Sequence, residues 1–367
     1  RWTMIIADTA QVILTFFIAW FLFTGRLAPW QVYVISVFGA VIGSFHGAAS
    51  HASLTMMVPE AHLARAAGLN GLSRSISGLL APTLAGILVV TIGLEGIVFI
   101  DLGTFLVALA TYFVIRIPRP PASPEATAIK GSLWRETLFG WRYVFDRPVL
   151  LSVTAIGASL NFFGGIASTL TLPMVLAMAD ADAGGLVLTA GAVGGFVSGS
   201  LMGAWGGPKN QVKGMVAFLI LGGLGLIIAG WYPLILAVIA GRFIYSFAMS
   251  LSGAMMTAIE IRQTSPDVQG RVFGAAGTVH LFFEAISYPT AGFLADRIFE
   301  PLMIEGGGLV PLLGSAMGTG SGRGMGLISV LMGICVLGIA VTAYWLPALR
   351  EFGQTNLVRT RFIRETT

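Results

Sequence analysis

The chain has 367 residues, of which 56% are hydrophobic and only 10% are charged, with a net charge of +4 and a mean hydropathy of +0.85. Soluble domains carry about 25% charged residues, so this composition excludes a soluble globular protein. Apolar runs of about 18 residues or more recur along the chain, and each is long enough to cross a bilayer as a helix. We therefore expect an all-α polytopic membrane protein.

Ten apolar spans follow one another in the sequence. They cover residues 4–24, 30–50, 72–93, 96–115, 150–177, 184–204, 214–231, 234–256, 272–294 and 325–346. If the spans alternate across the membrane, most of the 21 Lys and Arg residues share a side with Arg1 and the C-terminal tail. The other side holds Arg26, Arg297 and Arg323, and Arg242 lies inside a span. Because positive charge marks cytoplasmic loops, we predict a multi-pass protein of the cell (inner) membrane with both tails in the cytoplasm.

Two stretches of the chain resemble each other. One runs from Pro59 to Gly86 and the other begins at Pro266, and in each an arginine, Arg65 or Arg271, precedes small residues, an apolar run and a second proline. Two homologous halves are common in membrane transporters. The offset between the copies places the start of the first half upstream of this sequence, with room for two spans of roughly 20 residues. We therefore expect ten helices of a twelve-helix fold, an N-terminally truncated chain of two pseudo-symmetric six-helix halves.

The spans divide the chain into four parts. These are an N-terminal half over 1–115, a central cytoplasmic linker over 116–149, a six-span C-terminal half over 150–346 and a basic cytoplasmic tail over 347–367. In the linker, apolar residues from Leu133 to Phe145 recur on one helical face. Such an amphipathic helix either lies in the membrane interface or packs against the cytoplasmic ends of the spans.

The span over 184–204 carries glycine at every fourth position, a pattern that continues beyond its end. These residues are Gly191, Gly195, Gly199, Gly203 and Gly207. Their spacing predicts a groove along one helix face, in which a neighbouring helix packs closely. Static close packing and sliding of the neighbour are both compatible with the pattern.

Charged groups inside membrane spans are costly and tend to be functional. The candidates for proton coupling or gating are Glu284, Asp8, Arg242, Asp101 and His280. We rank Glu284 first for proton coupling. It shares a helix face with His280, four residues earlier, and its carboxyl group either carries a proton or pairs permanently with Arg242 or His280. Asp8 is either one member of a structural gating pair or a proton site. Asp101 lies near the end of its span, where it is either functional or in contact with the membrane interface.

A hydrophobic substrate requires an apolar, aromatic cavity with a few polar anchors. The candidate cavity residues are Phe45, His46, Asn161, Phe162, Phe163, Tyr245 and Phe247. Each is also compatible with ordinary packing or with lipid contact. The single cysteine, Cys335, allows no disulfide within the chain, and we expect no metal site.

Twelve predicted spans in two repeats with a basic central linker resemble the major facilitator superfamily. Several motifs resemble its macrolide-efflux branch of drug:proton antiporters. They are Arg1 to Asp8, Val58-Pro59-Glu60 with Arg65-Ala66, Gly140 to Val144, and Gln263-Thr264 with Gly270 to Phe273. The resemblance covers essentially the whole chain.

The third span also resembles the antiporter motif of the superfamily. Its glycine and proline positions are occupied by Gly68, Ser77, Ala81, Pro82, Ala85 and Gly86. Serine or alanine replaces several of the glycines, which keeps the side chains small. Pro82 removes one backbone donor and bends the helix, as an ordinary proline kink packed among small residues also would. In the superfamily this element is associated with export.

The resemblance implies proton-coupled export of amphipathic small molecules, such as drugs, macrolides or metabolites, by alternating access. The alternative is an uptake or siderophore transporter of the same superfamily. A membrane-embedded enzyme is disfavoured because no Ser-His-Asp set, metal-ligand cluster or phosphate-binding loop is recognisable in the sequence. We expect a monomer in the lipid bilayer that binds protons and its substrate, with no cofactor and no nucleic-acid partner.

Overall fold

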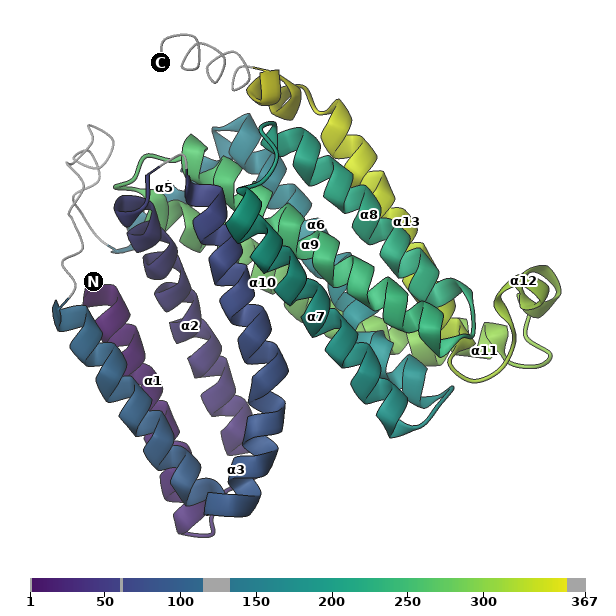
Figure 1. Cartoon of the computed structure of the whole chain (residues 1–367), viewed down its shortest axis with the longest axis horizontal. Helices are drawn as coiled ribbons and strands as arrows, with labels where there is room; N and C mark the ends of the chain where they lie inside the picture. Colours follow the sequence, from purple (N-terminus) through teal and green to yellow (C-terminus); the bar gives the residue numbers. More distant parts are fainter. Residues whose placement is uncertain (1, 60–61, 115–132, 355–367) are drawn as a thin grey trace. The chain divides into compact units, whose positions relative to one another are not determined.

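The computed structural model describes residues 2–59, 62–114 and 133–354, and every regular element in these ranges is a helix (Figure 1). The long helices are α1 (Trp2–Phe23), α2 (Pro29–Met57), α3 (Leu63–Val114), α6 (Pro148–Leu176), α7 (Ala181–Trp205), α8 (Gln211–Trp231), α9 (Ile235–Gln263), α10 (Gln269–Phe293) and α13 (Arg323–Trp345). The shorter ones are α5 (Leu133–Phe145), the π-helix η2 (Leu294–Phe299), α11 (Glu300–Met303) and α12 (Val310–Met317). The all-α prediction is confirmed for the described part of the chain.

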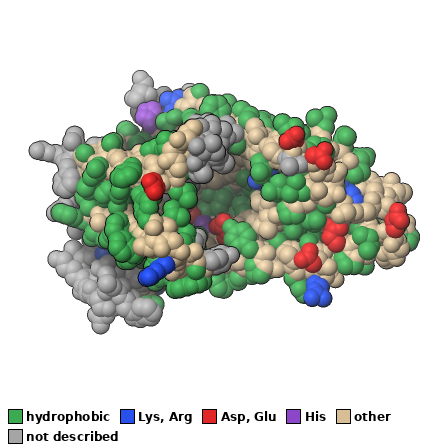
Figure 2. Space-filling view, turned by 90° about the horizontal axis from the view of Figure 1, so that it is seen from below, with side chains coloured by type: hydrophobic (Ala, Val, Ile, Leu, Met, Phe, Trp, Pro, Cys, Tyr) green, Lys and Arg blue, Asp and Glu red, His purple; other side chains and the backbone are tan. Residues whose placement is uncertain are grey.

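Seven helical segments in the described residues are long and apolar enough to cross a membrane. They are Trp2–Phe23, Thr91–Tyr112, Pro148–Leu176, Asp182–Trp205, Gln211–Trp231, Ile235–Gln263 and Arg323–Trp345. Each overlaps a predicted span. The remaining predicted spans, 30–50, 72–93 and 272–294, lie in the helices α2, α3 and α10, and their membrane crossing stays a prediction. Hydrophobic side chains are spread over much of the described surface in Figure 2, as expected for a protein in contact with lipid.

Gly93 divides α3 into two helical stretches. Its φ of 70° lies in the left-handed region, which glycine adopts without the steric cost of a Cβ atom. The break falls at the predicted boundary between the spans 72–93 and 96–115. One glycine therefore ends the first stretch and allows the second to begin.

The chain forms two compact units. The first contains Arg1–Glu60, Leu80–Tyr143 and Thr264–Thr278, and the second contains Ala61–Leu79, Val144–Gln263 and Val279–Thr367. The predicted division into two halves, a linker and a tail stays a prediction.

In the first unit, the linker helix α5 packs against the start of α10. A Cβ atom at Gly140 would overlap the carbonyl oxygen of Arg271, and the Tyr143 hydroxyl accepts a hydrogen bond from the backbone N–H of Ser265 at 3.3 Å. Gly140 and Tyr143 are buried, whereas Leu138 and Phe145 are exposed. The helix therefore packs through Gly140 and Tyr143, and the placement of its exposed apolar residues in the membrane interface stays a prediction.

In the second unit, glycines bring α8 close to both of its neighbours, α9 and α13 (Figure 1). A Cβ atom at Gly230 would overlap the carbonyl oxygen of Gly326 on α13, and one at Gly225 would lie 2.9 Å from the carbonyl oxygen of Gly241 on α9. Small residues permit such approach between membrane helices. These contacts give several of the 48 glycines a role in helix packing.

Arg323 links α8 to α13 at their adjoining ends. It is only 2% exposed, and its Nη2 donates to the carbonyl oxygens of Gly230 at 2.8 Å and Trp231 at 3.0 Å. These carbonyls belong to the last turn of α8, where a helix lacks internal donors. Glu300 completes the junction, because its carboxylate accepts hydrogen bonds from the N–H groups of Gly322 and Met325 at the start of α13.

Candidate functional site

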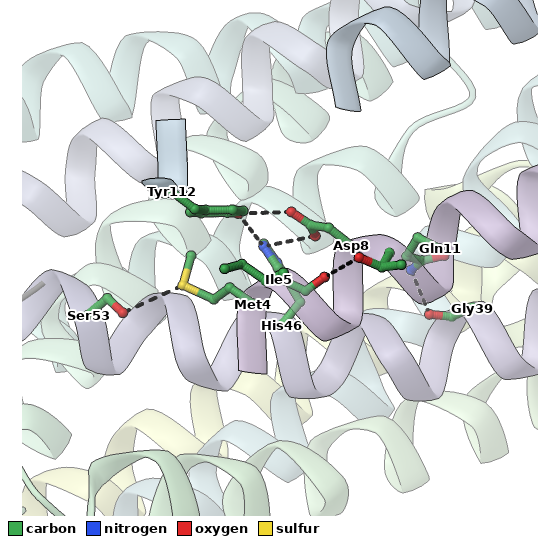
Figure 3. Close-up of polar contacts among 9 residues, drawn as sticks. Met4, Ile5, Asp8, Gln11, Gly39, His46, Ser53 and Tyr112 are labelled. Carbon is green, nitrogen blue, oxygen red and sulfur yellow. Dashed lines mark hydrogen bonds and ion pairs between the residues drawn. The ribbon is translucent and has the colours of Figure 1, made fainter. Parts of the chain in front are cut away.

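Three ionisable or polar side chains from α1, α2 and α3 meet in the first unit (Figure 3). The Tyr112 hydroxyl donates to Oδ2 of Asp8 at 2.9 Å, and Nε2 of His46 lies 3.3 Å from Oδ1 of the same carboxylate. The His46 ring nitrogen is also 3.2 Å from the Tyr112 hydroxyl. The Asp8 side chain is 21% exposed and that of His46 is 34% exposed, so both are partly withdrawn from the surface. We call Asp8, His46 and Tyr112 the α1–α3 polar cluster.

Contacts along α1 and α2 hold the cluster in place. One turn before Asp8, Met4 accepts a hydrogen bond at its sulfur from Ser53 at 3.6 Å, and three residues after it, Gln11 donates to the carbonyl oxygen of Gly39 at 3.0 Å. Successive contacts on α1 thus meet positions progressively earlier in α2, as in an antiparallel pair (Figure 3). Met4 is buried and contacts α2. Because Asp8 follows Met4 by one helical turn, it lies on the same face of α1, toward α2.

The contacts within the cluster depend on which of its members carry protons. An ionised Asp8 accepts hydrogen bonds from Tyr112 and from a protonated His46, and a protonated Asp8 no longer forms an ion pair with His46. Asp8 is predicted from the sequence for gating or proton binding and His46 for the substrate cavity, and the structure brings the two together. Tyr112 was not predicted from the sequence, because tyrosine near the end of a span is also common at the membrane interface.

Arg242 lies in a second group of polar residues, within the second unit. Its Nη1 donates to the Ser168 hydroxyl on α6 at 3.1 Å, and its guanidinium carbon is 5.7 Å from the centre of the Tyr245 ring on α9. Gly191 on α7 lies beside it, since a Cβ atom there would be 2.9 Å from Nε of Arg242. We call Arg242, Ser168 and Tyr245 the Arg242 cluster.

Glu284 and His280 have other partners than each other. The Glu284 Oε1 accepts a hydrogen bond from Tyr288, one turn later on α10, at 2.9 Å. Nε2 of His280 is 3.3 Å from the carbonyl oxygen of Thr154 on α6. The permanent pair of Glu284 with Arg242 or His280 is therefore not present in this structure. Asp101 is exposed on α3.

The remaining cavity candidates mostly contact one another or their own helix. The Phe162 ring lies 5.2 Å from Phe163 and 6.4 Å from Phe283, centre to centre. Asn161 donates to the carbonyl oxygen of Gly157, one turn earlier, at 2.8 Å. Phe45 is exposed, and the structure does not bring it into either polar cluster. Phe247 stacks on Phe243 at 6.2 Å.

The first stretch of α3 occupies part of the predicted glycine groove on α7. A Cβ atom at Gly199 would lie 2.7 Å from the backbone of Leu72, and one at Gly203 would lie 3.3 Å from the Leu69 side chain. Arg65 donates to the carbonyl oxygen of Ala204 near the end of α7 at 3.3 Å. Close packing is therefore confirmed at these two glycines, and sliding stays a prediction.

The antiporter-like motif follows this contact on α3. The helical backbone covers its positions, and the side chains of Ser77 and Ala81 are exposed. The other motif positions, Gly68, Pro82, Ala85 and Gly86, lie outside the described side chains. Among the residues that the structure describes, no group of three or more His, Cys, Asp and Glu side chains is placed to hold a metal ion.

The profile of the Major Facilitator Superfamily matches residues 1–286. Macrolide efflux protein A of Streptococcus pyogenes is 23% identical over 296 residues, which are 74% of this chain and 68% of that protein. Macrolide efflux protein A of Enterococcus faecalis is 23% identical over 277 residues, which are 69% of this chain and 79% of that protein. The uncharacterized MFS-type transporter YkuC of Bacillus subtilis (strain 168) is 22% identical over 320 residues, covering 83% and 73% respectively.

Two solved structures share the fold. The outward conformation of FucP, a Major Facilitator Superfamily transporter, matches with a TM-score of 0.61 and 11% identity, covering 93% of this chain and 82% of that chain. A structure of the E. coli fucose:proton symporter FucP matches with a TM-score of 0.63 and 12% identity, covering 93% and 83%. At such low identity the likeness concerns the arrangement of helices alone.

Proposed function

Because the chain belongs to the Major Facilitator Superfamily, we propose that it exports amphipathic small molecules in exchange for protons. Membership makes it a multi-pass membrane transporter and not an enzyme. Export is supported by the printed names of the two macrolide efflux relatives. In this proposal the described spans belong to ten helices of a twelve-helix fold in two halves. The protein works as a monomer in the inner membrane with cytoplasmic tails.

The observation that carries proton coupling is the α1–α3 polar cluster. Its carboxylate, imidazole and hydroxyl groups lie within 3.3 Å of one another on three helices. Charged groups in membrane spans are retained where they serve ion or proton pathways. A proton on Asp8 removes the attraction to His46, so it changes the contact between α1 and α2. A change of about 1–3 kcal/mol between two states shifts their ratio by about 5- to 150-fold, which is sufficient for coupling.

Glu284 remains a second candidate carboxylate for the proton. Its described partner is a neutral tyrosine on its own helix, so a proton on Glu284 would change no ion pair between helices. Protonation in the α1–α3 polar cluster would instead change a contact between two helices, so we propose the principal coupling site there.

Direction is tested by accumulation in living cells. Cells that express the protein are loaded with erythromycin, with the anionic dye dansylglycine and with its uncharged amide, and the retained amount of each is measured with and without a protonophore. Export predicts lower retention of at least one compound in expressing cells, and a rise to the level of control cells when the protonophore is added. Higher retention in expressing cells would instead support the uptake alternative.

A further inference from the structure

Arg242 is a cation inside a membrane span whose charge no described carboxylate balances. It lies about 10 Å along α9 from Ile235, so it is well within the helix. Its two recorded partners are the neutral Ser168 hydroxyl and the face of the Tyr245 ring. Within the described residues, no carboxylate oxygen lies within 4.0 Å of its guanidinium group. An unbalanced charge at this depth is costly and calls for an anionic partner.

The guanidinium group also has unused hydrogen-bond donors. Arginine presents five N–H donors in a planar fork, and Ser168 accepts from one of its terminal nitrogens. Nε is buried and has no hydrogen-bond partner. A carboxylate, sulfonate or phosphate can accept from such a fork through two oxygens at once.

Arg323, in the same unit, is an arginine whose contacts stabilise a helix end, and it can be compared with Arg242. Its Nη2 donates to two carbonyl oxygens that the last turn of α8 leaves without helical donors. Arg242 closes no helix end, and its position in α9 is an interior one. Both arginines have a buried Nε without a hydrogen-bond partner, but they differ in the groups that their terminal nitrogens contact.

Small residues let α6 and α7 pack closely against the Arg242 cluster. Gly191 lies beside Nε of Arg242, and a Cβ atom at Gly164 would overlap the Tyr245 hydroxyl. Ser168 follows Gly164 by one helical turn, so α6 turns both positions toward α9. Ser168 is exposed, and Arg242 and Tyr245 are partly exposed, so part of the cluster is accessible, although Nε of Arg242 is itself buried.

We propose that Arg242, together with the hydroxyl groups of Ser168 and Tyr245, binds an anionic group of the transported molecule. This proposal rests on the proposed transport function and narrows the substrate class to amphipathic molecules with a carboxylate, sulfonate or phosphate. The guanidinium group supplies the charge, and the two hydroxyls orient the anion. The aromatic ring of Tyr245 covers one side of the guanidinium group.

Two probes that differ only in charge test the proposal. Dansylglycine carries a carboxylate, and dansylglycinamide carries an uncharged amide in its place. Binding of each to the purified protein in phosphatidylcholine nanodiscs is followed by dansyl fluorescence. We expect wild-type protein to bind the anion more tightly than the amide. Arg242→Gln should weaken anion binding about tenfold or more and leave amide binding unchanged.

Two further variants control for charge and for folding. Arg242→Lys should recover part of the anion binding, because it restores the charge without the planar fork. Arg262→Gln makes the same substitution at an exposed position in the last turn of α9 and should bind both probes as wild type does. Thermal unfolding of Arg242→Gln should occur at or above the wild-type temperature, because the variant removes a charge without a carboxylate partner.

The opposite outcomes are equally definite. Equal dansylglycine affinity in wild type and Arg242→Gln, or no preference for the anion in wild type, would overturn the proposal. Competition by phosphatidylglycerol added to the nanodiscs would assign the site to a lipid headgroup and overturn it as well. Proton-driven transport of both probes without anion preference refutes the anion site alone. Tight anion binding without any proton-driven transport supports the site and refutes the proposed function.

Discussion

At the scale of single residues, the hydroxyl of Tyr112 is the group that joins the members of the α1–α3 polar cluster. It donates to Asp8 at 2.9 Å and lies 3.2 Å from Nε2 of His46. Tyr112→Phe keeps the ring but removes a hydrogen bond to a charged group, which contributes about 1.5–3 kcal/mol. We expect proton-driven transport to fall by roughly tenfold or more, measured as initial rate in proteoliposomes. Tyr232→Phe, at an exposed tyrosine outside the cluster, should transport at the wild-type rate, and an equal rate in both variants would contradict the role of Tyr112.

Individual candidates were easier to select from the sequence than to assign to a site. Asp8 and Arg242 stood out as charged groups in apolar spans, and His46 was predicted as a residue of the substrate cavity. Their partners did not stand out, because a sequence gives spacing along one helix but not which helices are neighbours. His46 was predicted as a cavity residue because the pairing of α1 with α2 cannot be read from the sequence. No sequence pattern distinguished Tyr112 or Ser168.

At the scale of helices, the glycines of α7 control the approach of α3. A Leu side chain at Gly199 would meet the backbone of Leu72, which cannot rotate away as a flexible side chain can. Overpacking of this kind destabilises a protein by about 1–3 kcal/mol, so we expect Gly199→Leu to unfold at a lower temperature. Gly185→Leu is the matched control on the same helix, because a Cβ atom at Gly185 meets nothing within 4 Å. A thermal unfolding midpoint of Gly199→Leu no lower than that of Gly185→Leu would show that this contact is not tight.

A second helix-scale prediction concerns the junction of α8 and α13. Arg323→Gln would leave the last carbonyls of α8 buried without their donor, at a cost of about 1–3 kcal/mol. We expect a lower thermal unfolding midpoint and retained anion binding at the Arg242 cluster. Arg297→Gln changes an exposed arginine of η2 and should leave the midpoint unchanged. A wild-type midpoint for Arg323→Gln would mean that water or neighbouring groups replace the guanidinium donor.

The sequence predicted those features of a helix that depend on that helix alone. The crowded face of α7 lies where the sequence predicts a glycine groove. The break at Gly93 falls at the predicted boundary between two spans, although this glycine was not itself predicted to cause it. Arg323, which the sequence places on the external side, is the buried first residue of α13, and its side of the membrane stays a prediction. Arg323 donates its hydrogen bonds to α8, which is distant in the sequence, so no local sequence pattern predicts this contact.

At the scale of the whole molecule, composition and the lengths of apolar runs were sufficient for the class of protein. They predicted an all-α polytopic membrane protein, and the helices, the family profile and the shared fold agree with that class. The polar groups within spans suggested transport because charge in hydrocarbon is costly. The proposed anionic class of substrate could not be predicted from the sequence, because it depends on the spatial neighbours of Arg242, which are neutral.

The most direct test of proton-coupled export is the collapse of an imposed pH gradient by added substrate in everted membrane vesicles. It is followed with a pH-sensitive dye for wild type, Asp8→Asn and Asp182→Asn, the last an exposed aspartate in the first turn of α7. We predict that substrate collapses the gradient with wild type and Asp182→Asn, and that Asp8→Asn, though folded, leaves the gradient intact. Undiminished collapse with Asp8→Asn would contradict the coupling role of the α1–α3 polar cluster. No collapse with wild type for any compound that the protein binds would contradict proton-coupled export itself.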